Sequence, residues 1–237
     1  MSLPLADHHG RKAQALQPLP GGPGGGLALA RGRVHEFCGP ARGVLAAMLM
    51  GECAGDVVWI GPSWLPERLY PDGLRAFADP GRLILARARR PEDLLWSMEE
   101  SLRSGAVGLV ICDMVAPPGL TPVRRLHLAA EAGAEAARHR GRPAPLGVML
   151  TPGAGGAQGV ETRWQLAALP TRAHEGANLP VWRLERLRAR MEPPARWSLR
   201  RGPGGAGYVA ERGEKEEGAL PPPLPRQGQG LPRDIYE

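Results

Sequence analysis

Short, continuous runs of apolar residues alternate with helical stretches through the middle of this 237-residue chain. Runs of this length, bounded by Gly and Pro, are typical of strands that are buried on both faces of a parallel sheet. The stretches between them have helical spacing, as the crossovers of a parallel sheet require. We expect strands at residues 34–38, 56–60, 82–86, 107–112 and 146–150, and helices at 41–52, 91–103 and 121–138. The sequence therefore predicts an α/β fold with a mostly parallel sheet.

The rest of the chain predicts an extension of this sheet and two tails. Residues 160–169 are expected to form another strand, and residues 181–190 and 196–201 two antiparallel strands joined around Glu-Pro-Pro. The 33 Gly and 26 Pro residues gather toward the two ends, which bury too little apolar surface to become ordered. We expect one domain at residues 29–201, with disordered tails at residues 1–28 and 202–237.

One strand-to-helix connection, HEFCGPARGVL at residues 35–45, is similar to a phosphate-binding loop. A working loop reads G-x-x-x-x-G-K-[ST], and its lysine and hydroxyl contact the phosphates and Mg²⁺. Here Gly39 and Gly43 are one residue closer together, and Val-Leu replaces the lysine and the hydroxyl residue. The chain has two lysines, Lys12 and Lys215, and both lie in the expected tails. The loop therefore predicts a degenerate nucleotide site.

Asp113 follows the apolar run at residues 107–112, as the Mg²⁺-holding carboxylate does in the Walker B pattern. The segment SLRSGAVGLVICD at residues 101–113 resembles the stretch that leads into this strand in the recombinase RecA. Residues 59–70 also align with the second strand of RecA and the segment after it, which places Ser63 where RecA has its water-activating glutamate. The resemblance implies a RecA-like core of the P-loop NTPase type.

Losses at this site predict a chain that is not an enzyme. Phosphoryl transfer depends on positioning and on neutralising charge, and one lost group commonly costs on the order of 3 kcal/mol of transition-state stabilisation. The lysine, the hydroxyl and the glutamate are all replaced, and Asp113 alone remains. We therefore expect no catalysis, no cofactor and no bound metal, with Gly39, Gly43 and Asp113 as remnants of a nucleotide site.

Four further segments closely resemble the ImuA family, RecA-like proteins of the bacterial SOS mutagenesis cassette. The segments are DPGRLIL (79–85), LLWSMEE (94–100), RRLHLAAE (124–131) and TRW (162–164). The resemblance extends over roughly residues 32–201, and it implies an accessory, adaptor role in DNA-damage-induced translesion synthesis. The implied partners are the Y-family-polymerase-like protein ImuB, an error-prone replicative-type polymerase and RecA itself.

Three alternatives remain open from the sequence. The first is an SOS cell-division inhibitor of the SulA type, another shortened RecA-like family. The second is an active ATP-dependent, DNA-binding recombinase, which the missing lysine argues against. The third is a structural RecA-like subunit with no role in mutagenesis.

Trp96 is the candidate partner contact. It lies beside the apolar stripe of its predicted helix, next to charged residues. Partly exposed tryptophans commonly anchor interfaces, although a Trp packed at the edge of the core would give the same pattern.

Arg124 and Arg125 are the candidate DNA contacts, because RecA has its first DNA-binding loop at the corresponding place. The glycine-rich segment at residues 153–159 corresponds to the second DNA-binding loop, but it has no basic residue. Arginine binds phosphate well, so DNA contact is an expectation that rests on these two side chains.

Composition predicts the cellular compartment of the protein but sets few other limits on its function. The net charge is +6, and 28 of the 30 basic residues are arginine, spread along the chain. The three cysteines show no metal-binding or disulfide spacing and read as buried thiols in a reducing cytosol. No apolar leader and no run long enough to span a membrane occurs. We expect a cytoplasmic protein without membrane contact.

Overall fold

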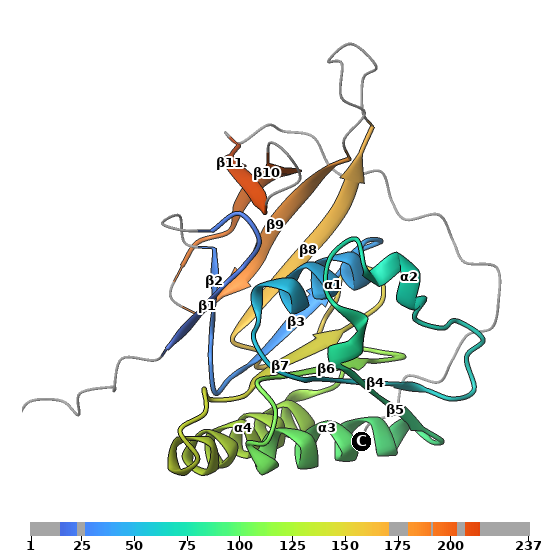
Figure 1. Cartoon of the computed structure of the whole chain (residues 1–237), viewed down its shortest axis with the longest axis vertical. Helices are drawn as coiled ribbons and strands as arrows, with labels where there is room; N and C mark the ends of the chain where they lie inside the picture. The colour runs from blue at the N-terminus through green and yellow to red at the C-terminus, as the bar shows by residue number, and fades with distance from the viewer. Residues whose placement is uncertain (1–14, 23–26, 171–179, 191, 203–206, 214–237) are drawn as a thin grey trace, which may run out of the picture.

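The computed structural model describes residues 15–22, 27–170, 180–190, 192–202 and 207–213. Most of its strands lie in one nine-stranded sheet with the order β11-β10-β9-β8-β3-β7-β6-β4-β5 (Figure 1). The predicted α/β class, with a mostly parallel sheet and antiparallel strands toward the C-terminus, is confirmed. The finer expectation of a RecA-like core stays a prediction.

Strands β8, β3, β7, β6, β4 and β5 run parallel to one another. Their bounds are β3 (Val34–Cys38), β4 (Val57–Pro62), β5 (Leu83–Ala88), β6 (Leu109–Asp113), β7 (Leu146–Leu150) and β8 (Thr162–Leu169). Every residue of β3 and β7 is buried, as expected for central strands covered on both faces. The predicted strands are present, with small shifts at their ends.

The antiparallel extension consists of β9 (Val181–Ala189), β10 (Ala195–Arg201) and β11 (Tyr208–Arg212). A buried arginine joins it to the parallel part. The Arg186 guanidinium lies 5.6 Å from the ring of Trp164 and 5.4 Å from that of Trp197. Cation–π attraction of this kind is stronger when the groups are desolvated. The guanidinium also pairs with Glu192 and donates to the carbonyl oxygen of Pro193 at 3.2 and 3.1 Å, which offsets the cost of burying its charge.

Helices cover both faces of the sheet (Figure 1). They are α1 (Arg42–Glu52), α2 (Pro71–Leu74), the 3-10 helix η1 (Pro80–Arg82), α3 (Pro91–Ser104) and α4 (Leu120–His139). α1 packs on one face with the core cluster around Phe37, and α3 and α4 lie together on the other face with the cluster around Val110. None of the described helices combines the length and the apolarity needed to cross a bilayer.

Two glycines let α3 and α4 touch near the end of α3. A Cβ at Gly133 would lie 1.9 Å from the carbonyl oxygen of Leu102, and a Cβ at Gly105 would lie 2.3 Å from that of Gly133. Gly105 also ends α3 in the left-handed conformation, with φ of 57°. The closest approach is therefore far from the N-terminal halves of the two helices.

A short hairpin corrects the expectation of disorder up to residue 28. β1 (Leu16–Pro18) and β2 (Ala28–Ala30) pair antiparallel. Arg31 holds the hairpin to the body by donating from Nη1 to two backbone carbonyl oxygens at 3.2 and 2.9 Å. The expectation is wrong because it rested on the Gly and Pro content alone. Three leucines of this segment are buried in the core on the α1 face: Leu19, Leu27 and Leu29.

The expectation of disorder after residue 201 is also wrong for β11. This strand pairs with β10 from Trp197↔Arg212 to Arg201↔Tyr208. The Tyr208 ring lies 6.3 Å from that of Trp182, in an edge-to-face arrangement that supplies the apolar contact. Of the expected tail residues, 1–14, 23–26, 203–206 and 214–237 lie outside the described residues.

Candidate functional site

The connection from β3 to α1, which is similar in sequence to a phosphate-binding loop, is unusually short. β3 ends at Cys38 and α1 begins at Arg42, so Gly43 lies inside the helix and not in the loop. Gly39 has φ of 85°, and a Cβ there would lie 2.8 Å from Cγ of Gln165. The turn therefore requires glycine at Gly39, whereas a Cβ at Gly43 would enter open space.

Two backbone amides of this loop already have acceptors. The amide of Gly39 donates to the carbonyl oxygen of Gly153 at 2.8 Å, and that of Ala41 donates to Leu166 at 3.1 Å. A phosphate-binding loop needs such amides free to point at the anion. These two are not available to a phosphate, because they tie the loop to neighbouring segments of the protein.

Asp113 lies at the end of β6, beside the first residue of α1. Nη2 of Arg42 is 3.8 Å from Oδ1 of Asp113, so a guanidinium stands close to the carboxylate expected to hold Mg²⁺. Ser63 is exposed, and its amide donates to the carbonyl oxygen of Ala88 at 2.8 Å. Within the described ranges, no group of three or more His, Cys, Asp or Glu residues is arranged to hold a metal.

Glu36 is a fully buried carboxylate in β3 that fixes the glycine loop after β7. Its Oε1 accepts hydrogen bonds from Thr151 Oγ1 at 2.6 Å and from the amides of Gly156 and Ala157 at 2.8 and 3.0 Å. Its Oε2 pairs with the Arg163 guanidinium from β8. These donors offset the cost of burying the charge. Sequence reasoning missed Glu36, although one acid in an otherwise apolar strand is a signal for it.

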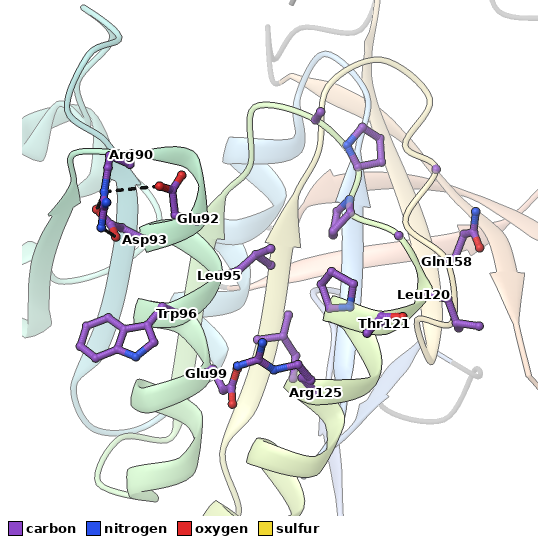
Figure 2. Close-up of a pocket in the computed structure, with 17 residues that line it drawn as sticks. Arg90, Glu92, Asp93, Leu95, Trp96, Glu99, Leu120, Thr121, Arg125 and Gln158 are labelled. Atoms are coloured by element: carbon purple, nitrogen blue, oxygen red, sulfur yellow. Dashed lines mark hydrogen bonds and ion pairs between the residues drawn. The ribbon is translucent and has the colours of Figure 1, made fainter. Parts of the chain in front are cut away.

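A groove of about 1250 Å³ opens between the N-terminal halves of α3 and α4 (Figure 2). The loop from β6 to α4, with Pro117 and Pro118, forms part of its lining, and so do Gly156 and Gln158 of the glycine loop. The groove lies beyond the C-terminal ends of the parallel strands, where open α/β sheets bind their ligands. The sequence did not predict this groove.

Apolar and charged side chains share the walls of the groove. Trp96 on α3 is 62% exposed, so the alternative in which it packs at the edge of the core is wrong. Leu120 at the start of α4 is also exposed. Between the helices, Arg125 Nη2 lies 2.9 Å from Glu99 Oε2, and Arg103 pairs with the same carboxylate. An exposed tryptophan beside such an ion pair is typical of a protein-docking surface.

α4 directs the two arginines expected to contact DNA into different hollows. Arg125 lines the groove and pairs with Glu99. Arg124 lines a second hollow of about 350 Å³, together with His127 and Arg190. Adjacent residues on a helix do not face each other, so the structure does not bring the two arginines to one phosphate. DNA contact through these side chains stays a prediction.

The three cysteines are buried, as the sequence predicts. Burial raises the pKa of Cys38 to about 12 and that of Cys53 to about 11, and it raises the pKa of Cys112 well above its ordinary value. Only the thiolate is a nucleophile or metal ligand. These thiols therefore stay protonated and unreactive at neutral pH.

No family model matches the chain, and no curated protein matches its sequence. Among solved structures, the chain is similar to SulA from Pseudomonas aeruginosa, with 20% identity and a TM-score of 0.40. The match covers 51% of this chain and 98% of that chain. A TM-score this low carries no argument about fold or function. Fold and site together define a mixed α/β protein with a wide groove at the C-terminal ends of its parallel strands.

Proposed function

We propose that this chain is a non-catalytic binding protein that docks a partner protein in the groove between α3 and α4. The observation that carries the proposal is the exposure of Trp96, which is 62% accessible on α3 at the rim of that groove (Figure 2). Burying a large aromatic side chain on association is favourable, and tryptophans in such positions often dominate the binding energy. The Glu99–Arg125 pair beside it presents one negative and one positive group, with which polar side chains of a partner protein can pair.

The β3–α1 loop supports a role without catalysis. Nucleotide hydrolysis needs free amides around the phosphates, a lysine and a Mg²⁺-holding hydroxyl. In this chain Val-Leu replaces the lysine and hydroxyl residue. The amides of Gly39 and Ala41 donate to protein carbonyls, and Asp113 has the Arg42 cation beside it. A nucleotide would have to displace these contacts to bind.

In finer terms, we propose an adaptor of the SOS mutasome that supports error-prone translesion synthesis in the cytoplasm. This rests on the resemblance of residues 32–201 to the ImuA family and on the RecA-like scaffold that the resemblance implies. The groove would then receive the ImuB-type polymerase-like protein, with the error-prone replicative-type polymerase and RecA as further partners.

A pull-down with matched variants tests this proposal. The bait is the full chain, and the prey is the Y-family-polymerase-like protein encoded in the same genome. Trp96→Ala is expected to weaken capture about tenfold or more, as truncation of an interface anchor does. Leu128→Ala is the control, because Leu128 is 57% exposed on the same helix pair but lies outside the groove.

Equal capture by Trp96→Ala and by the unchanged chain would overturn the assignment of the groove. Capture of a bacterial cell-division protein in place of the polymerase-like protein would overturn the mutasome role and favour the SulA-type alternative. Equal loss of capture in Trp96→Ala and Leu128→Ala would show that the loss is not specific to the groove, and it would overturn the assignment of the docking site to the groove.

A further inference from the structure

β5 is the last strand of the nine-stranded sheet, and no described strand pairs with its outer edge. Its residues pair with β4 in an unbroken parallel register, from Val57↔Leu83 to Pro62↔Ala88. A bulge, which would twist the edge away from other chains, is therefore absent from this pairing. A regular edge strand presents unpaired backbone N–H and C=O groups that another extended chain can bind.

The first four side chains of β5 leave this part of the edge without a charge. Ile84 is 48% exposed and Leu85 is 54% exposed, and successive residues of a strand point to opposite faces. Both faces of the edge are therefore apolar. Edge strands are usually guarded by charges, Pro or bulges, but Arg87 is the first charged residue in β5. At the other edge of the sheet, β11 carries Glu211, which pairs with Arg200.

Two arginines give the C-terminal end of this edge a positive charge. Arg87 and Arg89 are exposed, and neither forms an ion pair or side-chain hydrogen bond with any residue in the described ranges. Their neighbours are already engaged: Arg82 Nε donates to the carbonyl oxygen of Gly55 at 2.7 Å, and Arg90 pairs with Asp93. A carboxylate on a bound molecule would form favourable charge-assisted hydrogen bonds with these two guanidinium groups.

We propose that β5 accepts an extended segment of a partner protein as an added strand, with apolar side chains over Ile84 and Leu85 and a carboxylate against Arg87 or Arg89. Main-chain hydrogen bonds supply affinity in this mode of binding, and the side chains supply specificity. This surface is separate from the groove, so its test does not depend on the result for Trp96.

A second copy of this chain fits the edge less well than an acidic partner segment. Residues 83–90 include three arginines and no acid. A second β5 strand would therefore supply no carboxylate to Arg87 or Arg89, whereas an acidic segment would.

The test uses the full chain and a fluorescein-labelled peptide of about ten residues, with a Val/Thr core flanked by Asp and Glu. Fluorescence anisotropy is expected to show saturable binding at about 50 mM salt that weakens at about 300 mM, because the carboxylate contact is exposed to screening. Leu85→Lys and the double variant Arg87→Glu/Arg89→Glu are each expected to weaken binding about tenfold. Val209→Lys, a matched change on β11 at a residue that is 39% exposed, is expected to leave binding unchanged.

Circular dichroism of each variant establishes that the fold is kept. Unchanged peptide binding by folded Leu85→Lys would overturn the proposal, and so would an equal loss in Val209→Lys. Sedimentation showing a dimer that Leu85→Lys dissociates would also overturn it, since the occupant would then be a second copy. A peptide with a central Pro is expected to bind weakly, because it lacks a backbone donor, and equal binding by that peptide would contradict strand addition.

Discussion

At the scale of single residues, the Glu36 carboxylate joins three segments that are far apart in the sequence: β3, the glycine loop and β8. Glu36→Ala is expected to lower the free energy of unfolding by about 3 kcal/mol, because Arg163 would keep its charge without its partner. Urea denaturation followed by circular dichroism measures the change.

Glu211→Ala is the matched control for Glu36→Ala. The pair of Glu211 with Arg200 is exposed on both sides, so its loss is expected to change the free energy of unfolding by about 0.5 kcal/mol or less. Equal losses in the two variants would show that the buried network contributes no more than a surface ion pair.

His35 makes the stability depend on pH. Its ring is fully buried, with Nδ1 2.7 Å from Thr162 Oγ1 and Nε2 3.0 Å from the carbonyl oxygen of Ala30. Burial lowers the pKa of His35 from 6.5 to about 4. As the pH falls below 6.5, the unfolded chain therefore binds a proton that the folded chain does not. The contribution is complete above pH 6.5 and is lost as the pH falls toward 4.

Denaturation midpoints measured between pH 7.5 and 4.5 test this dependence. The free energy of unfolding is expected to fall across that range, and His127, whose pKa burial also lowers, contributes in the same direction. Replacement of exposed His139 by Gln is expected to keep the slope, and His35→Gln to reduce it. An unchanged slope in folded His35→Gln would contradict the assignment to His35.

Some residue-level features were predictable, and others were not. The need for Gly39 and the burial of the cysteines follow from local sequence, because a strand-to-helix turn and apolar strands set them. The role of Glu36 does not, because its partners in the glycine loop and β8 come together only in the folded sheet. Gly43 lies in α1, as the predicted helix at residues 41–52 implies, although the phosphate-loop pattern would need this second glycine in the loop.

At the scale of elements, the contact of α3 with α4 is set by glycine. Gly133→Ala is expected to destabilise the fold by about 2 kcal/mol, because the new Cβ would meet the Leu102 carbonyl oxygen at 1.9 Å and a helix backbone would have to move. Gly43→Ala is the matched substitution, in α1, where nothing lies within 4 Å of the added Cβ. It is expected to stabilise the fold by about 0.5 to 1 kcal/mol.

Thermal unfolding of the two alanine variants measures these opposite effects. A stabilised Gly133→Ala variant would show that the two helices can separate without cost, and that the close contact does not set their packing. A destabilised Gly43→Ala variant would show that the first turn of α1 needs glycine, as a working phosphate-binding loop does.

Most elements were predictable because their apolar periodicity is strong. The strands of the parallel part and helices α1, α3 and α4 belong to this group. The hairpin of β1 and β2 was not, since its short strands depend on leucines that bury against α1 and on anchoring by Arg31. β11 was missed for a similar reason, because the aromatic contact of Tyr208 is with Trp182 of β9, which is distant in sequence.

At the scale of the whole molecule, two surfaces are suited to protein contact and lie on different parts of the sheet. The groove opens beyond the C-terminal ends of the parallel strands, between α3 and α4, and β5 forms the outer edge of the sheet. The exposure of Trp96 was predictable from its position beside an apolar stripe, and its role as a contact stays a prediction. The groove itself was not, because it depends on the packing angle of two helices that are separated by β6 in the sequence.

Titration of the chain with ATP and Mg²⁺ in an isothermal calorimeter tests most directly whether the protein is unable to bind a nucleotide. We expect no saturable heat at ATP concentrations up to about 1 mM, which corresponds to a binding free energy weaker than about −4 kcal/mol. The reason is that the amides of Gly39 and Ala41 are engaged and that Arg42 stands beside Asp113. Micromolar binding that Asp113→Ala abolishes would contradict the proposed role as a non-catalytic binding protein.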